Sequence, residues 1–307
     1  MKKKLAEQEQ ALGMDHRETL KTVNEIGYLL FDQRKLEEAE PFFRRALEGN
    51  ERSLGRDHPN TLRAINNMGQ LLQALGRFEL AVPFFRRSLE GRERTLGPDH
   101  PDTLLSVRNM GSLLKAQDKL DLAEPFFRRC LEGFERTLGP DHRDTLTSVD
   151  NMGSLLQAQD KLDLAEPFYR RSLEGFERTL GRDYPLTLVS VDNMGSLIKA
   201  QGKLDLAEPF YRRALEGAER TLGREHPCTL LLVGNLGRLL QDLGKVNLAE
   251  PFYRRSLEGR ERTLGRDHPS TRVTVENLRL LLERSVEGGE KVWREQENKG
   301  GDDHRHK

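Results

Sequence analysis

Residues His100 to Asp141 read HPDTLLSVRNMGSLLKAQDKLDLAEPFFRRCLEGFERTLGPD, and this stretch decides the fold because the chain repeats it every 42 residues. Three markers recur in step. A proline followed by two aromatic residues and two arginines stands at Pro41, Pro83, Pro125, Pro167, Pro209 and Pro251. A threonine recurs at Thr19, Thr61, Thr103, Thr145, Thr187, Thr229 and Thr271. A glycine after leucine recurs at Gly13, Gly55, Gly97, Gly139, Gly181, Gly223 and Gly265. This unbroken register indicates a tandem repeat.

Each unit contains two helical patterns. The first half carries apolar residues at Leu104, Val107, Met110 and Leu114, a spacing that places them on one face of a helix. The second half is apolar at Leu122, Ala123, Phe126, Phe127, Cys130 and Leu131. The second pattern continues to about Leu138, and Gly139 is a usual signal for a helix end. We therefore predict a pair of helices per unit, named helix A and helix B.

Two local details have alternative explanations. Pro101 suits the first position of helix A, where a missing N–H costs nothing, and either Asp99 or Thr103 caps the helix start. Gly133 lies inside helix B, where glycine costs about 1 kcal/mol relative to alanine. The same glycine recurs at Gly49, Gly91, Gly175, Gly217 and Gly259. Either a neighbouring backbone approaches closely at Gly133, or helix B bends there.

Composition excludes several classes of protein. The 307 residues include 50 Lys+Arg and 50 Asp+Glu, so the net charge of zero argues against long-range attraction to nucleic acid or acidic membranes. No run of ~18 apolar residues is present to span a membrane. The start, MKKKLAEQEQ, lacks the apolar segment of a secretory signal. Cys130 and Cys228 cannot form a disulfide framework and suit a reducing compartment. We expect a cytoplasmic protein.

The ends of the array differ from its middle. A lone helix pair cannot bury its apolar stripe, so neighbouring pairs must stack and the terminal ones need caps. Residues 1–13 match the latter half of a helix B and are predicted to be a partial helix B or N-terminal cap. The tandem array covers residues 14–284. Residues 285–297, which include Trp293, are predicted to form a degenerate capping helix, and residues 298–307 a disordered polar tail.

These residues resemble a known family. Asn-x-Gly-x-Leu-Leu, then Gly-Lys-Leu, then Ala-Glu-Pro-Phe-Tyr-Arg-Arg-Ala-Leu-Glu resembles tetratricopeptide repeats, and Asn193 to Glu216 carries the pattern almost whole. The 42-residue period with its Leu-Gly-x-Asp/Glu-His-Pro linker resembles the kinesin light chain-like and nephrocystin-3-like subtype. The resemblance implies an all-α, right-handed superhelical solenoid of about seven helix pairs. The heptad coiled coil of kinesin light chains and the nucleotide-binding module of nephrocystin-like relatives are not visible in the sequence.

The resemblance also implies a binding surface. In the family, helix A lines a concave groove, and its asparagine contacts the backbone of bound peptide. Here that position holds Asn67, Asn109, Asn151, Asn193, Asn235 and Asn277. An amide both donates and accepts hydrogen bonds, so it pairs with an extended peptide of any sequence. The alternative is that these asparagines bond only to a neighbouring helix.

Neighbouring positions on helix A would set specificity. Arg108, Lys115, Lys199 and Arg238 are predicted to hold acidic groups of a ligand. Asp150 and Asp192 make the centre of the groove locally acidic. We therefore expect a peptide or protein partner of mixed charge, and no cofactor.

Other chemistries have weaker support. The arginine pairs of helix B suggest RNA binding, but Glu90 follows Arg86 by four residues, as in an ordinary surface ion pair. Bases would also need interleaved aromatic residues to stack on. Each histidine of the array stands alone in its linker, whereas a zinc site needs three or four converging ligands. The Asn109-Met110-Gly111-Ser112 stretch lies in a helix and not in a strand-to-helix turn, so no enzyme is predicted.

We interpret the chain as a non-enzymatic protein–protein interaction scaffold that binds peptide or protein segments in the groove, as kinesin light chain-like cargo adaptors do. One alternative is a structural module that associates weakly head to tail through its open ends. RNA binding through the arginine face of helix B is the third reading.

Overall fold

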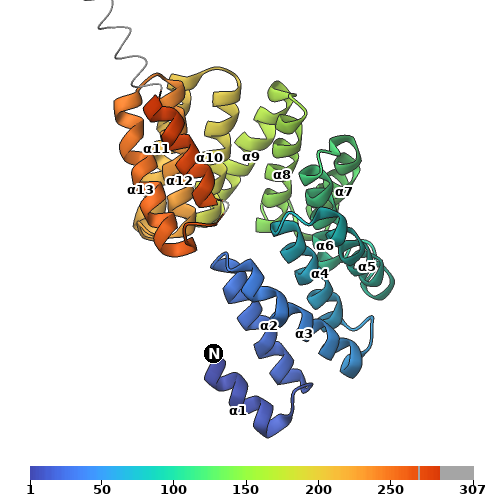
Figure 1. Cartoon of the computed structure of the whole chain (residues 1–307). Helices are drawn as coiled ribbons and strands as arrows, with labels where there is room; N and C mark the ends of the chain where they lie inside the picture. Colours follow the sequence, from blue (N-terminus) through green and yellow to red (C-terminus); the bar gives the residue numbers. More distant parts are fainter. Residues whose placement is uncertain (269, 284–307) are drawn as a thin grey trace, which may run out of the picture. The chain divides into compact units, whose positions relative to one another are not determined.

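The computed structural model describes residues 1–268 and 270–283, and all regular elements in that part are helices (Figure 1). They are α1 (Lys2–Leu12), α2 (Arg17–Asp32), α3 (Leu36–Leu54), α4 (Pro59–Ala74), α5 (Phe78–Leu96), α6 (Pro101–Ala116), α7 (Leu120–Leu138), α8 (Arg143–Ala158), α9 (Leu162–Leu180), α10 (Pro185–Ala200), α11 (Leu204–Thr221), α12 (Pro227–Asp242) and α13 (Val246–Leu264). Residues 270–283 are helical as well. The predicted helix pairs are confirmed: even-numbered helices are helix A, and odd-numbered helices from α3 are helix B.

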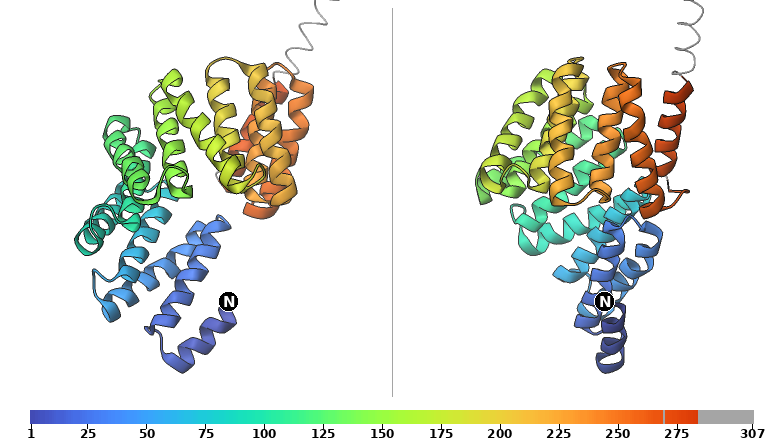
Figure 2. Two further views of the ribbon diagram at one scale, coloured as in Figure 1. Left: turned by 180° about the vertical axis from the view of Figure 1, so that it is seen from behind. Right: turned by 90° about the vertical axis from the view of Figure 1, so that its left-hand side faces the viewer.

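The chain divides into two compact units. The first covers Met1–Gly181 with α1 to α9, and the second begins at Arg182 with α10. Within each unit, a helix B packs on its own helix A and on the helix A of the next pair. In the second unit the helices stand side by side, with residues 270–283 at the end of the row (Figure 2). Each unit is therefore a stack of helix pairs, as expected for an α-solenoid.

Helix α1 packs on the following helix pair as a helix B does. Its Leu5 is buried against Val23 of α2 and Ala46 of α3. Its Glu9 Oε1 lies 2.5 Å from Nη1 of Arg45. This packing suits a partial helix B, although the boundaries of the array stay a prediction. The predicted capping helix at 285–297 and tail at 298–307 lie outside the described residues.

Every described helix A except α10 is capped by histidine at its start, so both predicted caps of α6 are wrong. The Nδ1 atom of His100 accepts the backbone N–H of Asp102 at 3.1 Å. The threonine position has another role, because Thr145 Oγ1 donates to the carbonyl of Gly139 at 2.7 Å and ties the helix to its linker. Equivalent caps form at His16, His58, His142, His226 and His268. Proline does occupy the first turn of α6, as expected.

The glycine inside helix B marks a close side-chain contact. A Cβ atom on Gly133 would lie 2.5 Å from Cδ2 of Leu104, on the helix A of the same pair. The approaching group is thus a leucine side chain and not a backbone, and α7 runs through Gly133 without interruption. A second contact points the other way, since a Cβ on Gly69 would lie 2.8 Å from the ring of Phe85. The two helices of a pair therefore pack closely at two places: a leucine of helix A lies over a glycine of helix B, and an aromatic ring of helix B lies over a glycine of helix A.

The arginine pairs of helix B have partners other than the predicted glutamate. The first arginine bonds to a glutamate four residues earlier in every pair except that of Arg86, which has Val82 there, and the 2.5 Å pair of Arg128 with Glu124 is an example. The second reaches the preceding helix B, as in the 2.7 Å pair of Arg129 with Glu93. No ion pair of Arg86 or Arg87 with Glu90 occurs in the described structure. The arginines do form surface ion pairs, as predicted, but with other glutamates. The second arginine of an Arg-Arg sequence links its helix to the preceding helix B.

Candidate functional site

The predicted site residues all lie on A helices. In the first unit these are Asn67 on α4, Arg108, Asn109 and Lys115 on α6, and Asp150 and Asn151 on α8. In the second unit they are Asp192, Asn193 and Lys199 on α10, Asn235 and Arg238 on α12, and Asn277 within residues 270–283. Each unit therefore presents its own share of the predicted surface.

Asparagines of successive A helices are bonded to one another. The Nδ2 group of Asn67 donates to Oδ1 of Asn24 at 2.9 Å, and that of Asn109 donates to Oδ1 of Asn66 at 2.8 Å. These bonds match the alternative in which the asparagines join neighbouring helices. One amide retains a second N–H and an acceptor oxygen after such a bond. Asn67 is only 3% exposed, so it has little surface to offer a ligand.

The same bond occurs in the second unit with a carboxylate as acceptor. Asn235 Nδ2 lies 3.0 Å from Oδ2 and 3.3 Å from Oδ1 of Asp192. Burial raises the pKa of Asp192 to about 6, and the hydrogen bond from Asn235 opposes that shift. Asp192 is therefore part of the joint between α10 and α12 as well as part of the predicted surface.

The predicted lysines are already engaged. Lys115 Nζ donates to Oγ of Ser154 on α8, and burial lowers the pKa of Lys115. Lys199 Nζ lies 2.6 Å from Oδ2 of Asp242 on α12. A ligand would have to compete with these contacts. Sequence reasoning missed Asp242, although its spacing from Lys199, one period plus one residue, is the spacing of the asparagine bonds.

Three predicted residues meet at one cavity of the second unit. Asn235, Arg238 and Asn277 line a space of about 320 Å³ between α12 and residues 270–283. Leu231, Gly234, Tyr253, Arg260, Ser270, Val273 and Thr274 complete its walls. Leu231 and Val273 are 50% and 53% exposed, so the cavity combines an apolar surface with amide and guanidinium donors.

Gly234 opens this cavity. Its Cβ would lie 3.5 Å from Ser256 Oγ and 3.7 Å from Arg260 Nη2, which are ordinary contacts, and its backbone is not left-handed. The fold therefore does not require glycine here. In the other repeats, the equivalent position holds Asn24, Asn66, Arg108, Asp150, Asp192 and Glu276. The sequence could have indicated this cavity, because Gly234 is the only small residue at a position that is polar in the other repeats. The sequence analysis did not use this difference.

Arg260 forms part of the same wall. Its Nη1 donates to the carbonyl of Ser270 and to Oγ1 of Thr274, both at 2.8 Å. Burial lowers the pKa of Arg260. Its bonds hold the end of α13 against residues 270–283, which fixes the width of the cavity.

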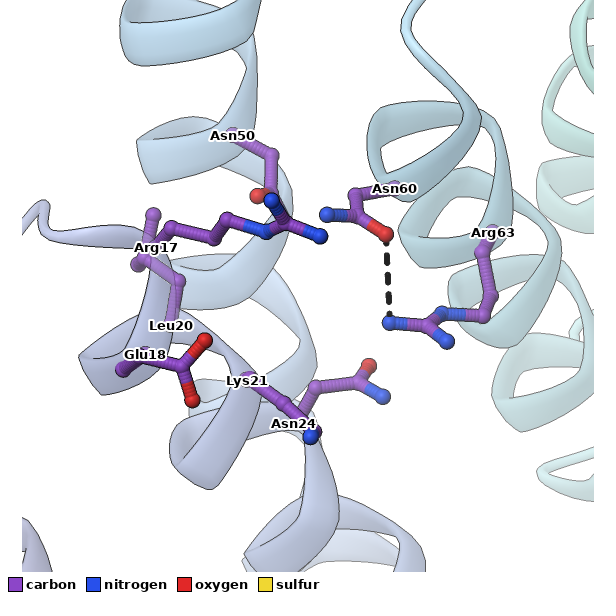
Figure 3. A pocket seen from close by; sticks show the side chains of 8 residues that line it. All are labelled: Arg17, Glu18, Leu20, Lys21, Asn24, Asn50, Asn60 and Arg63. Carbon is purple, nitrogen blue, oxygen red and sulfur yellow. Dashed lines mark hydrogen bonds between the residues drawn. The ribbon is translucent and has the colours of Figure 1, made fainter.

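A second cavity lies in the first unit and contains none of the predicted residues. It encloses about 210 Å³ between α2, α3 and α4 (Figure 3). Arg17, Glu18, Leu20, Lys21, Asn24, Asn50, Asn60 and Arg63 line it.

The linker histidines serve as helix caps. Residues 1–268 and 270–283 contain no group of three or more histidine, cysteine, aspartate or glutamate side chains placed to hold a metal ion. Over the same residues, no helix has the length and apolar character needed to cross a membrane.

Comparison with known proteins identifies the class of the chain. The tetratricopeptide repeat model matches residues 18–94, 64–136, 103–178 and 187–262. The chain therefore belongs to the tetratricopeptide repeat family, as the sequence pattern predicted. No curated protein matches it.

Solved structures with the same fold include kinesin light chain-like proteins, which agrees with the predicted subtype. A Podosopora anserina kinesin light chain with nearly identical TPR-like repeats shares 21% identity, covers 67% of this chain and 98% of its own, and has a TM-score of 0.53. BtubC (BKLC) from P. vanneervenii shares 22% identity over 76% of this chain and 94% of its own, with a TM-score of 0.58. A Rap protein in complex with competence and sporulation factor shares 13% identity over 86% and 75%, also with a TM-score of 0.58.

Proposed function

We propose that this chain is a non-enzymatic scaffold that binds a peptide or protein segment on its A helices. The observation that carries the proposal is the cavity at Gly234, where Asn235, Arg238 and Asn277 converge beside exposed apolar side chains. Membership of the tetratricopeptide repeat family supports it. So does the likeness in fold to the Rap protein that was solved with competence and sporulation factor. Both cysteines are free, which suits a cytoplasmic setting.

The cavity suggests how a segment would be held. An apolar side chain of the ligand enters the space above Gly234 and packs on Leu231 and Val273. The amides of Asn235 and Asn277 bond to the ligand backbone, while the exposed guanidinium of Arg238 pairs with an acidic residue beside the apolar one. Burying one large apolar side chain contributes about 1.5–3 kcal/mol, which corresponds to roughly ten- to hundredfold in affinity.

Two substitutions at one position test this proposal. Displayed peptides are selected on the wild-type chain and then titrated against Gly234→Leu and Gly234→Ala. Leucine fills the cavity, so we expect at least tenfold weaker binding. Alanine adds one methyl group and we expect binding within about threefold of wild type. Both residues favour a helix more than glycine does, so lost binding would not reflect unfolding. Circular dichroism checks the fold.

The outcomes are distinct. Peptides that bind Gly234→Leu as tightly as wild type would overturn the cavity as the binding site. An Asn109→Ala/Asn151→Ala/Asn193→Ala variant tests the predicted asparagine surface separately. If selection yields no peptide and sedimentation shows mass rising with protein concentration, the head-to-tail alternative replaces the proposal.

A further inference from the structure

Three cations surround the cavity of the first unit with little to neutralise them. Arg17 and Lys21 come from α2, and Arg63 comes from α4. No salt bridge joins any of these three side chains to a carboxylate in the described part of the chain. Glu18 is the one acidic residue that lines the cavity, so its walls carry a formal charge of +2.

The side chains of Arg17 and Arg63 extend toward the gap between their helices. Figure 3 shows the guanidinium groups of Arg17 and Arg63 turned toward each other across the gap between α2 and α4. Nη2 of Arg63 is 3.4 Å from Oδ1 of Asn60. Asn50, 6% exposed, closes the cavity from α3. All three cationic side chains are exposed, so solvent screens part of their mutual repulsion, and an anion held between them would neutralise the rest.

The cavity exists because Asn50 is short. At the same position of the next 42-residue repeat, Arg92 reaches across the gap and donates to the carbonyl of Asp102 at 2.7 Å and to Oγ of Ser106 at 2.9 Å. In the repeat after that, Phe134 occupies this position and is fully buried. Asn50 does not fill the corresponding gap, and the arginines and lysine of α2 and α4 remain around the space.

We propose that this cavity binds a phosphate monoester group, presented by the bound segment as phosphoserine or phosphothreonine. A phosphate group carries a charge of about −1.5 to −2 at neutral pH and offers three acceptor oxygens, which matches the charge of +2 and the paired guanidinium donors. A carboxylate would neutralise only half of that charge. The statement that a bound segment presents the phosphate group rests on the proposed function. The statement that the cavity binds an anion does not.

The test uses the full chain in phosphate-free buffer and isothermal titration. The probes are inorganic phosphate, acetate, and a peptide with and without phosphoserine. We expect phosphate to bind at least fivefold more tightly than acetate, and the phosphorylated peptide at least fivefold more tightly than its unmodified twin. Arg63→Gln should weaken phosphate binding at least fivefold, whereas Glu18→Gln should strengthen it because a nearby like charge is removed.

The matched control is Arg86→Gln, which removes an exposed arginine of α5 outside the cavity. Equal losses in Arg63→Gln and Arg86→Gln would show only non-specific charge attraction and overturn the site. Equal affinity for acetate and phosphate would overturn the ligand class. Phosphate binding without preference for the phosphorylated peptide would overturn the peptide source. Tighter binding of an RNA oligonucleotide, lost steeply with salt, would assign the cavity to nucleic acid. The Gly234→Leu titration tests the proposed function independently, since Gly234 lies in the other unit.

Discussion

Glycines in the middle of these helices have two different roles. Gly133 lies under a buried leucine, and all three side-chain atoms that approach it are within 3.2 Å of the position a Cβ would take. Leu104 is 0% exposed, so it has no free space to rotate into. Gly234 has no such neighbour, and its missing side chain leaves a cavity instead. Gly133 is required by close packing and recurs in every helix B, whereas Gly234 occurs in one repeat and leaves open space.

Alanine at these two glycines should change stability in opposite directions. Gly133→Ala gains about 1 kcal/mol in helix propensity but overpacks Leu104 at a cost of about 1–3 kcal/mol, so we expect a net loss near 1 kcal/mol. Gly234→Ala should gain about 0.5–1 kcal/mol because only the propensity changes. Urea unfolding followed by circular dichroism measures both. A gain in stability for Gly133→Ala would show that the leucine contact is not tight.

At the scale of the helix, the linker histidine determines where each helix A begins. Its Nδ1 satisfies one backbone N–H that the helix would otherwise leave without a partner. Tyr184 stands at that position before α10 and makes no side-chain cap bond. Helix α10 therefore starts without the side-chain cap that histidine provides at the starts of the other described A helices.

Restoring the cap should stabilise the second unit. We expect Tyr184→His to raise the free energy of unfolding by about 0.5–1 kcal/mol, because it adds the missing acceptor. His142→Ala should lower it by about 1 kcal/mol in the first unit. Thermal unfolding compares both variants with wild type. Tyr184→Ala is the control, and an equal gain there would mean that removing the tyrosine, and not adding a cap, is responsible.

At the scale of the whole molecule, successive pairs are joined by ladders of polar contacts. Outer arginines bridge one helix B to the linker of the preceding pair, as Arg136 does to Asp99 at 2.5 Å. These side chains are mostly exposed, so each pair contributes a few tenths of a kcal/mol. The inner ladder of asparagines is more buried. The acceptor in this ladder is the amide oxygen of Asn24 or Asn66 in the first unit, and the carboxylate of Asp192 in the second unit.

The buried carboxylate of Asp192 predicts a pH dependence of unfolding. The pKa of Asp192 is about 6 in the folded chain and lower when unfolded, so the folded state binds the proton more tightly. The resulting stability is present at low pH and is lost as the pH rises through about 6. We expect Asp192→Asn, which recreates the asparagine pair, to be more stable than wild type by roughly 1–3 kcal/mol at pH 8, with the difference shrinking as the pH falls and vanishing only below about pH 4. Urea unfolding across this range is the measurement. A difference that does not change with pH would rule out titration of Asp192.

The sequence predicted the elements well because they depend on local patterns. The period of the apolar residues and the glycine after Leu138 placed the end of α7 at the residue where the structure has it. The same reasoning failed for the cap of α6 because three neighbouring polar side chains compete there, and only the backbone geometry of the linker selects His100. It also failed for the arginine pairs of helix B, where Glu90 was predicted for Arg86, since a glutamate on the same helix and one on the preceding helix B are equally consistent with the period.

The candidate site was predicted only in outline. The A helices were chosen by resemblance, and Asn235, Arg238 and Asn277 do meet at a cavity. The hydrogen bonds that occupy the asparagines were left as an alternative, because they join residues that are far apart in the chain. Neither cavity was predicted, because each arises where one short residue, Gly234 or Asn50, fails to fill a gap between stacked helices.

The sequence by itself therefore determined that this chain is a tandem array of tetratricopeptide helix pairs, since periodicity and helix signals are local properties. Only the tertiary structure decided which polar groups bond across pairs, where a leucine presses on a glycine, and where space is left open. Those features depend on the distance and register between helices, and these are set by how complete side chains pack and not by the pattern of apolar residues along one helix.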